Sequence, residues 1–174
     1  MLALVVMPPV AAPVDAATGT TVRVSVSSAG EQGQAGSTSP NMSGDSRFIA
    51  FESLATNLVA GDTNGVWDVF VHDKLTGATE RVSVGNDESQ ANEQSVSPEV
   101  SADGRFVAFH SIATNLVPGD TNNRADVFIR DRQTGSTERL SVAGGGAQSD
   151  GQSSGASINA DGRYVAFESV ATNL

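Results

Sequence analysis

The sequence predicts an all-β protein built from repeated four-stranded antiparallel sheets, and three observations lead to this class. Arg47, Arg105 and Arg163 open matching segments, so a unit repeats every 58 residues without insertion or deletion. Charged residues make up only 17% of the chain, while glycine, serine, threonine and asparagine are plentiful, which favours short strands joined by turns. Gly, Pro, Asn or Asp interrupts every candidate helical window, so no helix is expected.

Each unit predicts four strands in two hairpins. In one copy, SPEVS and RFVAFHS flank the turn formed by residues 102–104, where Gly104 supplies a positive φ. After a polar loop, DVFIRD and TERLSV flank the glycine-containing connection RQTGS and form the second hairpin. We refer to these four strands, in chain order, as strands a, b, c and d of a unit.

The apolar pattern indicates how the units pack. In RFVAFHS, Phe106 and Ala108 lie on one face of the strand while Val107 and Phe109 lie on the other, a pattern typical of a strand covered on both sides. A small sheet that is apolar on both faces must lie between neighbours like itself. Strand d alternates polar and apolar residues, as an outer strand does. These are the features of β-propeller blades.

The residues of the unit also resemble a known family. SPEVSADGRFVAF followed by DVFIRDRQTGSTERLSV is similar to the TolB-like (WD-repeat-like) β-propeller repeat, with its turn after Ser-Pro, its strand ending in Ala-Phe and its Asp-x-x-Thr-Gly. The resemblance covers about residues 17–174. The unit is longer than the usual propeller repeat of about 40–45 residues. The resemblance implies a periplasmic or extracellular protein that interacts with other proteins through loops at the propeller rim or mouth.

We expect a leader followed by about two and a half blades. Residues 1–16 contain a short apolar run before Val14 and Ala16, which have the spacing of a signal-peptidase site, so they are interpreted as a signal-peptide remnant. The alternative is a disordered apolar start. No segment reaches the length of a membrane span. The remaining chain is predicted to be a partial β-propeller over 17–174, with strand d at 20–27, blades at 39–84 and 97–142, and a half-blade at 155–169.

The predicted strand order, d, abcd, abcd, ab, is an incomplete propeller, because closed rings have about four to eight blades. One explanation is a truncated gene or a fragment of a longer exported propeller. A second is self-association of short chains through open blade edges, although no strand c would then lie between the last strand b and the free strand d. A third, an open solenoid, leaves apolar faces exposed. We expect the first.

Two polar loops carry candidate ligands for a hard cation. Oxygen-bearing side chains stand at relative positions one, three and seven of GDTNGVWD and GDTNNRAD, namely Asp62, Asn64 and Asp68, then Asp120, Asn122 and Asp126. Ca²⁺ prefers six to eight such oxygens, so Ca²⁺ is the one cofactor that the sequence suggests. Neither loop has an acid at position five or a terminal glutamate. In the alternative, which we favour, these side chains form Asx turns and cap strand c without a metal.

An arginine recurs on strand d, as Arg23, Arg81 and Arg139. It is expected to pair with a recurring acid at the end of strand c, such as Asp73 or Asp131, and to belong to the blade architecture.

Composition excludes several functions. Ten basic and twenty acidic residues give a formal net charge of −10, which disfavours nucleic acid and anionic lipid. The absence of cysteine excludes disulfides and thiolate metal sites. The two histidines, His72 and His110, align with Arg or Glu in other copies and are expected on the surface. No nucleophile elbow, zinc-helix motif or phosphate loop is present, so no catalytic residue is predicted.

The sequence therefore predicts an exported β-propeller module that binds a protein, peptide or glycan at its rim or mouth. Two alternatives remain. The chain is the non-catalytic propeller part of a secreted hydrolase that cleaves peptides or glycans, or it is a calcium-dependent adhesion or surface module.

Overall fold

The computed structural model describes residues 3–6 and 20–174, and the regular elements there are strands. The predicted leader lies outside the described residues except for its strand at 3–6. No helix in the described ranges is long and apolar enough to cross a membrane. The strands are β1 (Ala3–Val6), β2 (Thr20–Arg23), β3 (Ser37–Met42), β4 (Phe48–Ser53), β5 (Asp68–Asp73), β6 (Thr79–Arg81), β7 (Ser95–Val100), β8 (Phe106–Ser111), β9 (Asp126–Asp131), β10 (Ser136–Arg139), β11 (Ser153–Ile158) and β12 (Val165–Ser169).

The strands form the predicted blades. Two four-stranded antiparallel sheets have the orders β3-β4-β5-β6 and β7-β8-β9-β10, which are strands a to d of two successive units. β11 and β12 form a two-stranded sheet that corresponds to strands a and b of a third unit. At the other end β1 pairs with β2. The described sheets do not close a ring, so the all-β, incomplete-propeller prediction is confirmed.

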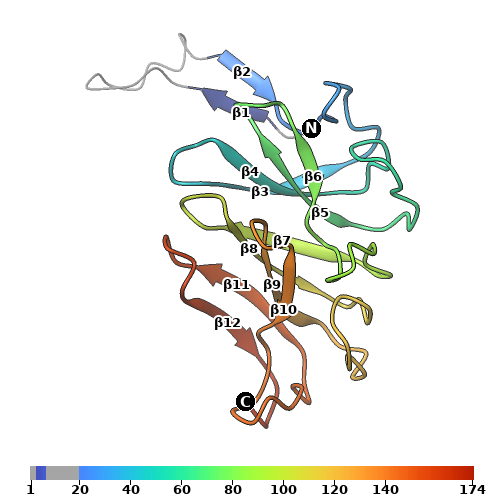
Figure 1. Cartoon of the computed structure of the whole chain (residues 1–174), viewed down its shortest axis with the longest axis vertical. Helices are drawn as coiled ribbons and strands as arrows, with labels where there is room; N and C mark the ends of the chain where they lie inside the picture. Colours follow the sequence, from blue (N-terminus) through green and yellow to red (C-terminus); the bar gives the residue numbers. More distant parts are fainter. Residues whose placement is uncertain (1–2, 7–19) are drawn as a thin grey trace.

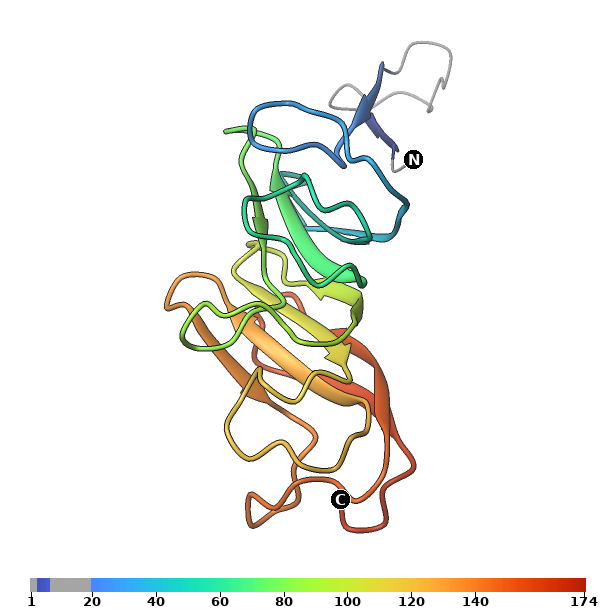
Figure 2. The same cartoon turned by 90° about the vertical axis from the view of Figure 1, so that its right-hand side faces the viewer.

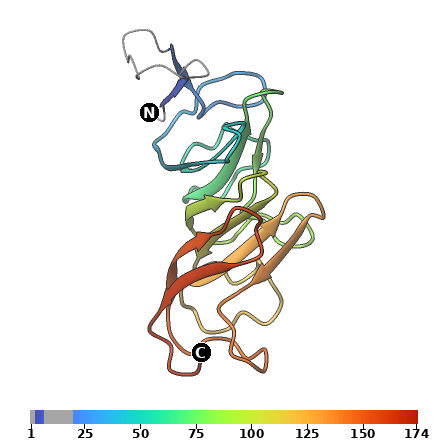
Figure 3. The same ribbon diagram turned by 90° about the vertical axis from the view of Figure 1, so that its left-hand side faces the viewer.

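The sheets stack face to face along the long axis of the molecule, in chain order from the N-terminal to the C-terminal end (Figures 1, 2 and 3). The largest core cluster joins Ala50 and Val71 of the first complete blade to Val107 and Phe109 of the second. All four side chains are at most 1% exposed. Strand b is therefore covered on both sides, as the doubly apolar pattern predicts.

The centre of each blade contains a pair of aromatic rings. Phe51 of β4 lies opposite Phe70 of β5, with ring centroids 5.8 Å apart. Phe109 of β8 and Phe128 of β9 repeat this arrangement at 6.0 Å. Because the four rings are fully buried, each pair adds a stacking contact to the apolar area that the blade buries.

The turns between strands a and b bring neighbouring blades close together. Gly104 has φ +74°, and a Cβ atom there would lie only 2.0 Å from a ring carbon of Phe48 in the preceding blade. Gly162 repeats this relation to Phe106, at φ +73° and 2.3 Å. The predicted positive φ of Gly104 is confirmed. The glycine is required for a second reason as well, since only a residue without Cβ leaves room for the ring.

Backbone hydrogen bonds also link these turns. The amide of Gly44 donates to the carbonyl of Ala102 at 3.0 Å, and the amide of Ala102 donates to the carbonyl of Ala160 at 2.9 Å. One residue of each turn thus bonds to the equivalent residue of the next unit. The 58-residue repeat of the sequence therefore corresponds to the step from one blade to the next in the structure.

Candidate functional site

The connections between strands b and c, residues 54–67 and 112–125, lie at one edge of the stack with the connections between blades, residues 82–94 and 140–152. We call this edge the loop edge. Figure 1 shows it on the right, opposite the turns that join β3 to β4, β7 to β8 and β11 to β12. Loops at one edge of a rigid scaffold are where binding residues concentrate in folded proteins.

A buried cluster of charged and amide side chains supports the loop edge in the first complete blade. Asp68, the first residue of β5, is fully buried and accepts hydrogen bonds from Ser83 Oγ at 2.6 Å and Gln90 Nε2 at 3.0 Å. Gln90 Nε2 also donates to Asp62 at 2.9 Å. Arg81 Nη1 lies 3.6 Å from Asp62 and 3.7 Å from Asp68. The cluster thus ties loop 54–67 to strand d and to the next connection.

Asn64 completes this cluster. Its side-chain amide donates to Asp68 Oδ2 and to the carbonyl of Ala91, each at 3.0 Å. Its side-chain oxygen accepts the amide of Val66 at 3.2 Å, which is the bond of an Asx turn. We call Asp62, Asn64, Asp68, Arg81 and Gln90 the first loop cluster.

The second complete blade repeats the arrangement. We call the equivalent residues the second loop cluster, which contains Asp120, Asn122, Asp126, Arg139 and Gln148. The guanidinium of its arginine lies 3.5 and 3.9 Å from the two carboxylates. The amide of its glutamine donates to the same carboxylates at 2.7 and 3.1 Å. Two copies with matching contacts show that the sequence GDTN encodes this cluster together with residues far along the chain.

Burial governs the electrostatics of the clusters. The side chains of Asp62 and Asp120 are 3% and 2% exposed, and burial raises the pKa of both carboxyl groups although a glutamine amide opposes the shift. The Nε and Nη1 atoms of Arg81 and Arg139 are buried and have no hydrogen-bond partner within the described part of the chain.

The structure brings the six candidate calcium ligands together as two triplets, one per loop cluster. Each triplet also faces a guanidinium and the side-chain amide of a glutamine. In the described ranges no group of three His, Cys, Asp or Glu side chains is placed to hold a metal ion. Calcium binding remains a hypothesis, and a cation at this position would have to compete with an arginine that is already there.

The partner predicted for the strand d arginine is wrong. Arg81 contacts Asp62 and Asp68 at the loop edge, whereas Asp73 lies at the opposite end of β5 and binds Arg47 through two bonds of 2.9 and 2.7 Å. Antiparallel pairing places Arg81 beside Phe70, nearer the first residue of β5 than the last. The second blade shows the same arrangement, with Arg139 on Asp120 and Asp126, and Arg105 on Asp131.

The surface position predicted for the histidines is also wrong. His72 is only 7% exposed, and its Nδ1 lies 2.9 Å from Thr79 Oγ1. His110 is partly buried, and its Nδ1 is buried without a hydrogen-bond partner in the described residues. Burial lowers the pKa of both imidazoles. The equivalent of His72, Arg130, is itself 6% exposed, so a polar residue at this position does not mean a surface position.

The ATNL motif has a role that the sequence did not reveal. Asn57 donates to the carbonyl of Gln32 at 2.9 Å and accepts the amide of Gln34 at 3.0 Å. Asn115 makes the same two contacts, to Gln90 and Asn92. The asparagine therefore clamps the connection between two blades against the strand b–c loop. In the sequence, the only sign of this role is the exact recurrence of the motif in three copies.

Beside each clamp the surface is hollowed. The first hollow, about 490 Å³, lies between Ser27–Ala29 and Asn57–Ala60. The second, about 390 Å³, lies between Asn86–Asp87 and Thr114–Gly119. We call them the junction grooves. Their floors share Asn-Leu-Val, with the leucines 1% exposed, whereas their rims differ between the copies.

No family model and no curated protein matches the sequence. Solved structures are similar. For putative TolB from Agrobacterium tumefaciens the TM-score is 0.52 at 18% identity, over 80% of this chain and 40% of that one. For TolB from Acinetobacter baumannii the TM-score is 0.46 at 19% identity, over 79% of this chain and 27% of that one. For the β-propeller domain of the Trilobed protease from Pyrococcus furiosus the TM-score is 0.48 at 15% identity, over 76% of this chain and 34% of that one.

The chain spans at most two fifths of the length of each of these structures. Its antiparallel four-stranded sheets, its face-to-face stacking and its likeness to the Agrobacterium structure agree on the fold. The chain is a run of β-propeller blades, and their fold is similar to that of the Agrobacterium structure.

Proposed function

We propose that this chain is a binding module of an exported protein and that a protein or peptide ligand lies along the loop edge in the junction grooves. The observation that carries the proposal is the repetition of the grooves, with a shared floor and different rims, on one edge of the stack. A rigid frame with variable loops is typical of binding surfaces. The loop clusters supply the rigidity, because they hold each loop through buried hydrogen bonds.

The rims indicate what each groove favours. Ser28 and Ala29 give the first rim a small, uncharged surface. Asn86 and Asp87 give the second rim an amide and an acid. Hydrogen bonds from Ser89 lower the pKa of Asp87, so its carboxylate is charged at neutral pH. An extended ligand with a basic residue at the second groove and a small apolar residue at the first therefore matches the edge.

Peptide display against the immobilised protein tests this proposal. Selected peptides should carry Lys or Arg, and their affinity should fall at least about tenfold with Asp87→Lys, since like charges then face each other. Leu75→Lys is the matched control, because Leu75 is 74% exposed, lies in the turn between β5 and β6, and lines neither groove. If selected peptides bind the Asp87→Lys variant and the wild type equally, the proposal is wrong.

Export is proposed from the leader alone. Cleavage after Ala16 would give a mature chain that begins at Ala17. N-terminal sequencing of the protein recovered from a bacterial periplasm should find that start. An uncleaved protein retained in the cytoplasm would contradict export while leaving the groove proposal intact.

A further inference from the structure

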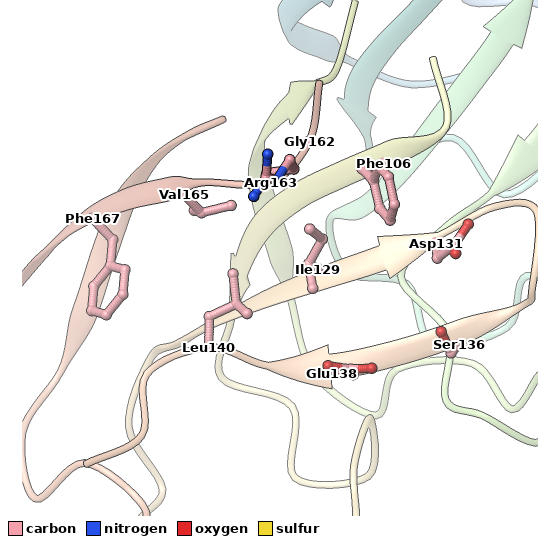
Figure 4. Close-up of a pocket in the computed structure, with 10 residues that line it drawn as sticks. All are labelled: Phe106, Ile129, Asp131, Ser136, Glu138, Leu140, Gly162, Arg163, Val165 and Phe167. Carbon is pink, nitrogen blue, oxygen red and sulfur yellow. The ribbon is translucent and has the colours of Figure 1, made fainter. Parts of the chain in front are cut away.

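One asparagine of the first loop cluster stands in a dipeptide that makes its side chain reactive. Asn64 and Gly65 form the only Asn-Gly pair in the sequence. The backbone nitrogen that follows an asparagine can attack the side-chain carboxamide, and a following glycine favours this attack because it has no Cβ atom to obstruct it. By contrast, no described asparagine lines the hollow between β9, β10 and β12 that Figure 4 shows. A covalent change is therefore expected at the loop edge.

Gly65 offers an accessible peptide group for this attack. It is exposed, its φ is +68°, and no atom lies within 4 Å of the position that a Cβ would take. Solvent therefore reaches the backbone around its nitrogen, and a base in solution can remove the amide proton. The deprotonated nitrogen is the nucleophile of the reaction.

The carboxamide of Asn64 is held in place for the attack. Its Oδ1 accepts the amide of Val66 at 3.2 Å, and this Asx turn folds the side chain back over the peptide group of Gly65. As the nitrogen attacks, negative charge develops on Oδ1, and a hydrogen bond that already points at this atom stabilises the charge. Bonds of 3.0 Å from Nδ2 to Asp68 and to the carbonyl of Ala91 keep the side chain in this orientation.

The second loop cluster supplies a matched asparagine that lacks the glycine. Asn122 donates to Asp126 at 3.0 Å and to the carbonyl of Ser149 at 3.1 Å. It also accepts the amide of Arg124 at 2.8 Å. The residue that follows it is Asn123, which has φ +52° and carries a side chain. The two asparagines therefore share their contacts and differ in the next residue.

We propose that Asn64 deamidates in the folded protein and that the product releases loop 54–67 from the first loop cluster. A bond forms between the nitrogen of Gly65 and Cγ of Asn64, and the bond from Cγ to Nδ2 breaks. The side-chain nitrogen leaves as ammonia, which takes up the equivalent of the proton that Gly65 gave to solvent, and a succinimide ring remains. Water then opens the ring at either carbonyl and leaves aspartate or isoaspartate. The steps together consume one water molecule, release one ammonia molecule and need no oxidant or reductant.

The product cannot keep the contacts of the asparagine. A carboxylate at position 64 has only acceptors, so it would face Asp68 Oδ2 and the carbonyl of Ala91, to both of which the amide donated. The guanidinium of Arg81, which lies 3.6 and 3.7 Å from two carboxylates, would be shared among three. Loop 54–67 therefore loses its tie to the next connection. This inference does not rest on a ligand in the junction grooves.

Peptide mapping of the aged full chain measures the modification. Tryptic peptides 48–74 and 106–124 contain Asn64 and Asn122 respectively. After incubation in neutral buffer made with heavy-oxygen water, which labels the product, mass spectrometry should find the label at Asn64. Deamidation there should be at least about tenfold faster than at Asn122, because only Asn64 lies beside an unhindered nitrogen.

An exchange of the following residues tests the cause. Gly65→Asn should slow deamidation of Asn64 to the rate of Asn122, and Asn123→Gly should speed Asn122 to the rate of Asn64. The backbone tolerates both changes, since each loop receives the residue that the other loop already carries at positive φ. Both variants should therefore melt close to the wild-type temperature.

The consequence for the cluster is tested with Asn64→Asp, which matches one product. This variant should melt at a lower temperature than the wild type, because it replaces a donor to Asp68 by a like charge. Gln133→Glu adds the same charge at an exposed position and should leave the melting temperature unchanged. Equal deamidation of Asn64 and Asn122 overturns the proposal, and so does a chain in which Asn64 reacts only after unfolding. An Asn64→Asp variant that melts like the wild type overturns the release of the loop.

Discussion

The guanidinium of Arg81 lies 3.6 Å from the carboxylate of Asp62, and one unit later Arg139 lies 3.5 Å from Asp120. In each case an outer-strand arginine reaches a loop that precedes it by nearly twenty residues, so the contact determines how the loop edge is built.

Replacement of Arg139 by Met should destabilise the protein by about 3 kcal/mol, because it leaves two buried carboxylates without their cation. Urea unfolding measures the effect. Glu138→Gln is the control, since Glu138 is exposed on the same strand and should change stability by less than about 0.5 kcal/mol. Equal stability of the two variants would show that the cluster does not support the fold.

Calcium should leave the melting temperature unchanged, because a guanidinium already faces each aspartate pair. Thermal unfolding in EDTA and in millimolar Ca²⁺ measures this. A ligand that binds only the folded state raises the melting temperature with concentration. A rise that disappears in Asp62→Asn/Asp120→Asn would therefore establish the calcium site and contradict the expected result.

Gly104→Ala should be more destabilising than Gly61→Ala, although both glycines have φ +74°. Both substitutions place a Cβ atom on a residue with the same positive φ, and each therefore costs on the order of 1 kcal/mol in backbone strain. Only at Gly104 does the new Cβ meet a ring, that of Phe48, whereas nothing lies within 4 Å at Gly61. The difference in unfolding free energy thus isolates the contact between blades. Equal losses would mean that the turn does not touch the preceding blade.

Acid should destabilise the protein through its bidentate arginine pairs. Hydrogen bonds from Arg105 hold the pKa of Asp131 far below its ordinary value, and Arg47 does the same for Asp73. A folded-state pKa below the unfolded value of about 3.9 gives stability that is present above that pH and lost below it. Asp131→Asn should therefore lose less stability than the wild type between about pH 6 and pH 3.

Protonation of Asp120 changes stability in the opposite direction to protonation of Asp131. Burial raises its pKa, so protonation as the pH falls favours the folded state and offsets part of the acid loss. Asp120→Asn removes this offset and should make the loss steeper than in the wild type. Chemical denaturation at each pH measures both slopes, and an identical pH dependence in all three proteins would rule out this assignment of the acid response.

Much of the fold could be predicted because its causes are local. The doubly apolar strand at Phe106–Phe109 and the glycine at position 104 each reflect a constraint on a few neighbouring residues. Their repetition at a fixed step gives the stacking, since each face needs an equivalent face to cover it. The order of strands within each sheet then follows from the two hairpins.

The loop clusters could be predicted only in part. GDTN marked the acids, but the donors Arg81 and Gln90 come from other segments, and only the folded blade brings them together. The partner of Arg81 was missed because strand c has a recurring aspartate at each end, Asp68 and Asp73 in β5. Choosing between these two acids requires the register of β5 with β6. His72 was missed because a polar side chain can be buried where a hydroxyl such as that of Thr79 satisfies it.

Equivalent turns of successive blades lie in contact, and the cysteine-free chain allows a direct test of this contact. A Cβ atom at Gly44 would lie 3.0 Å from Cβ of Ala102. Both turns need to move by only about half an ångström to reach the Cβ separation of a disulfide. Gly44→Cys/Ala102→Cys should therefore form an intramolecular disulfide under mild oxidation, detected by mass spectrometry, whereas Gly44→Cys/Ala160→Cys should not. Free thiols in the first variant, or equal crosslinking in both, would contradict the stacked-blade structure.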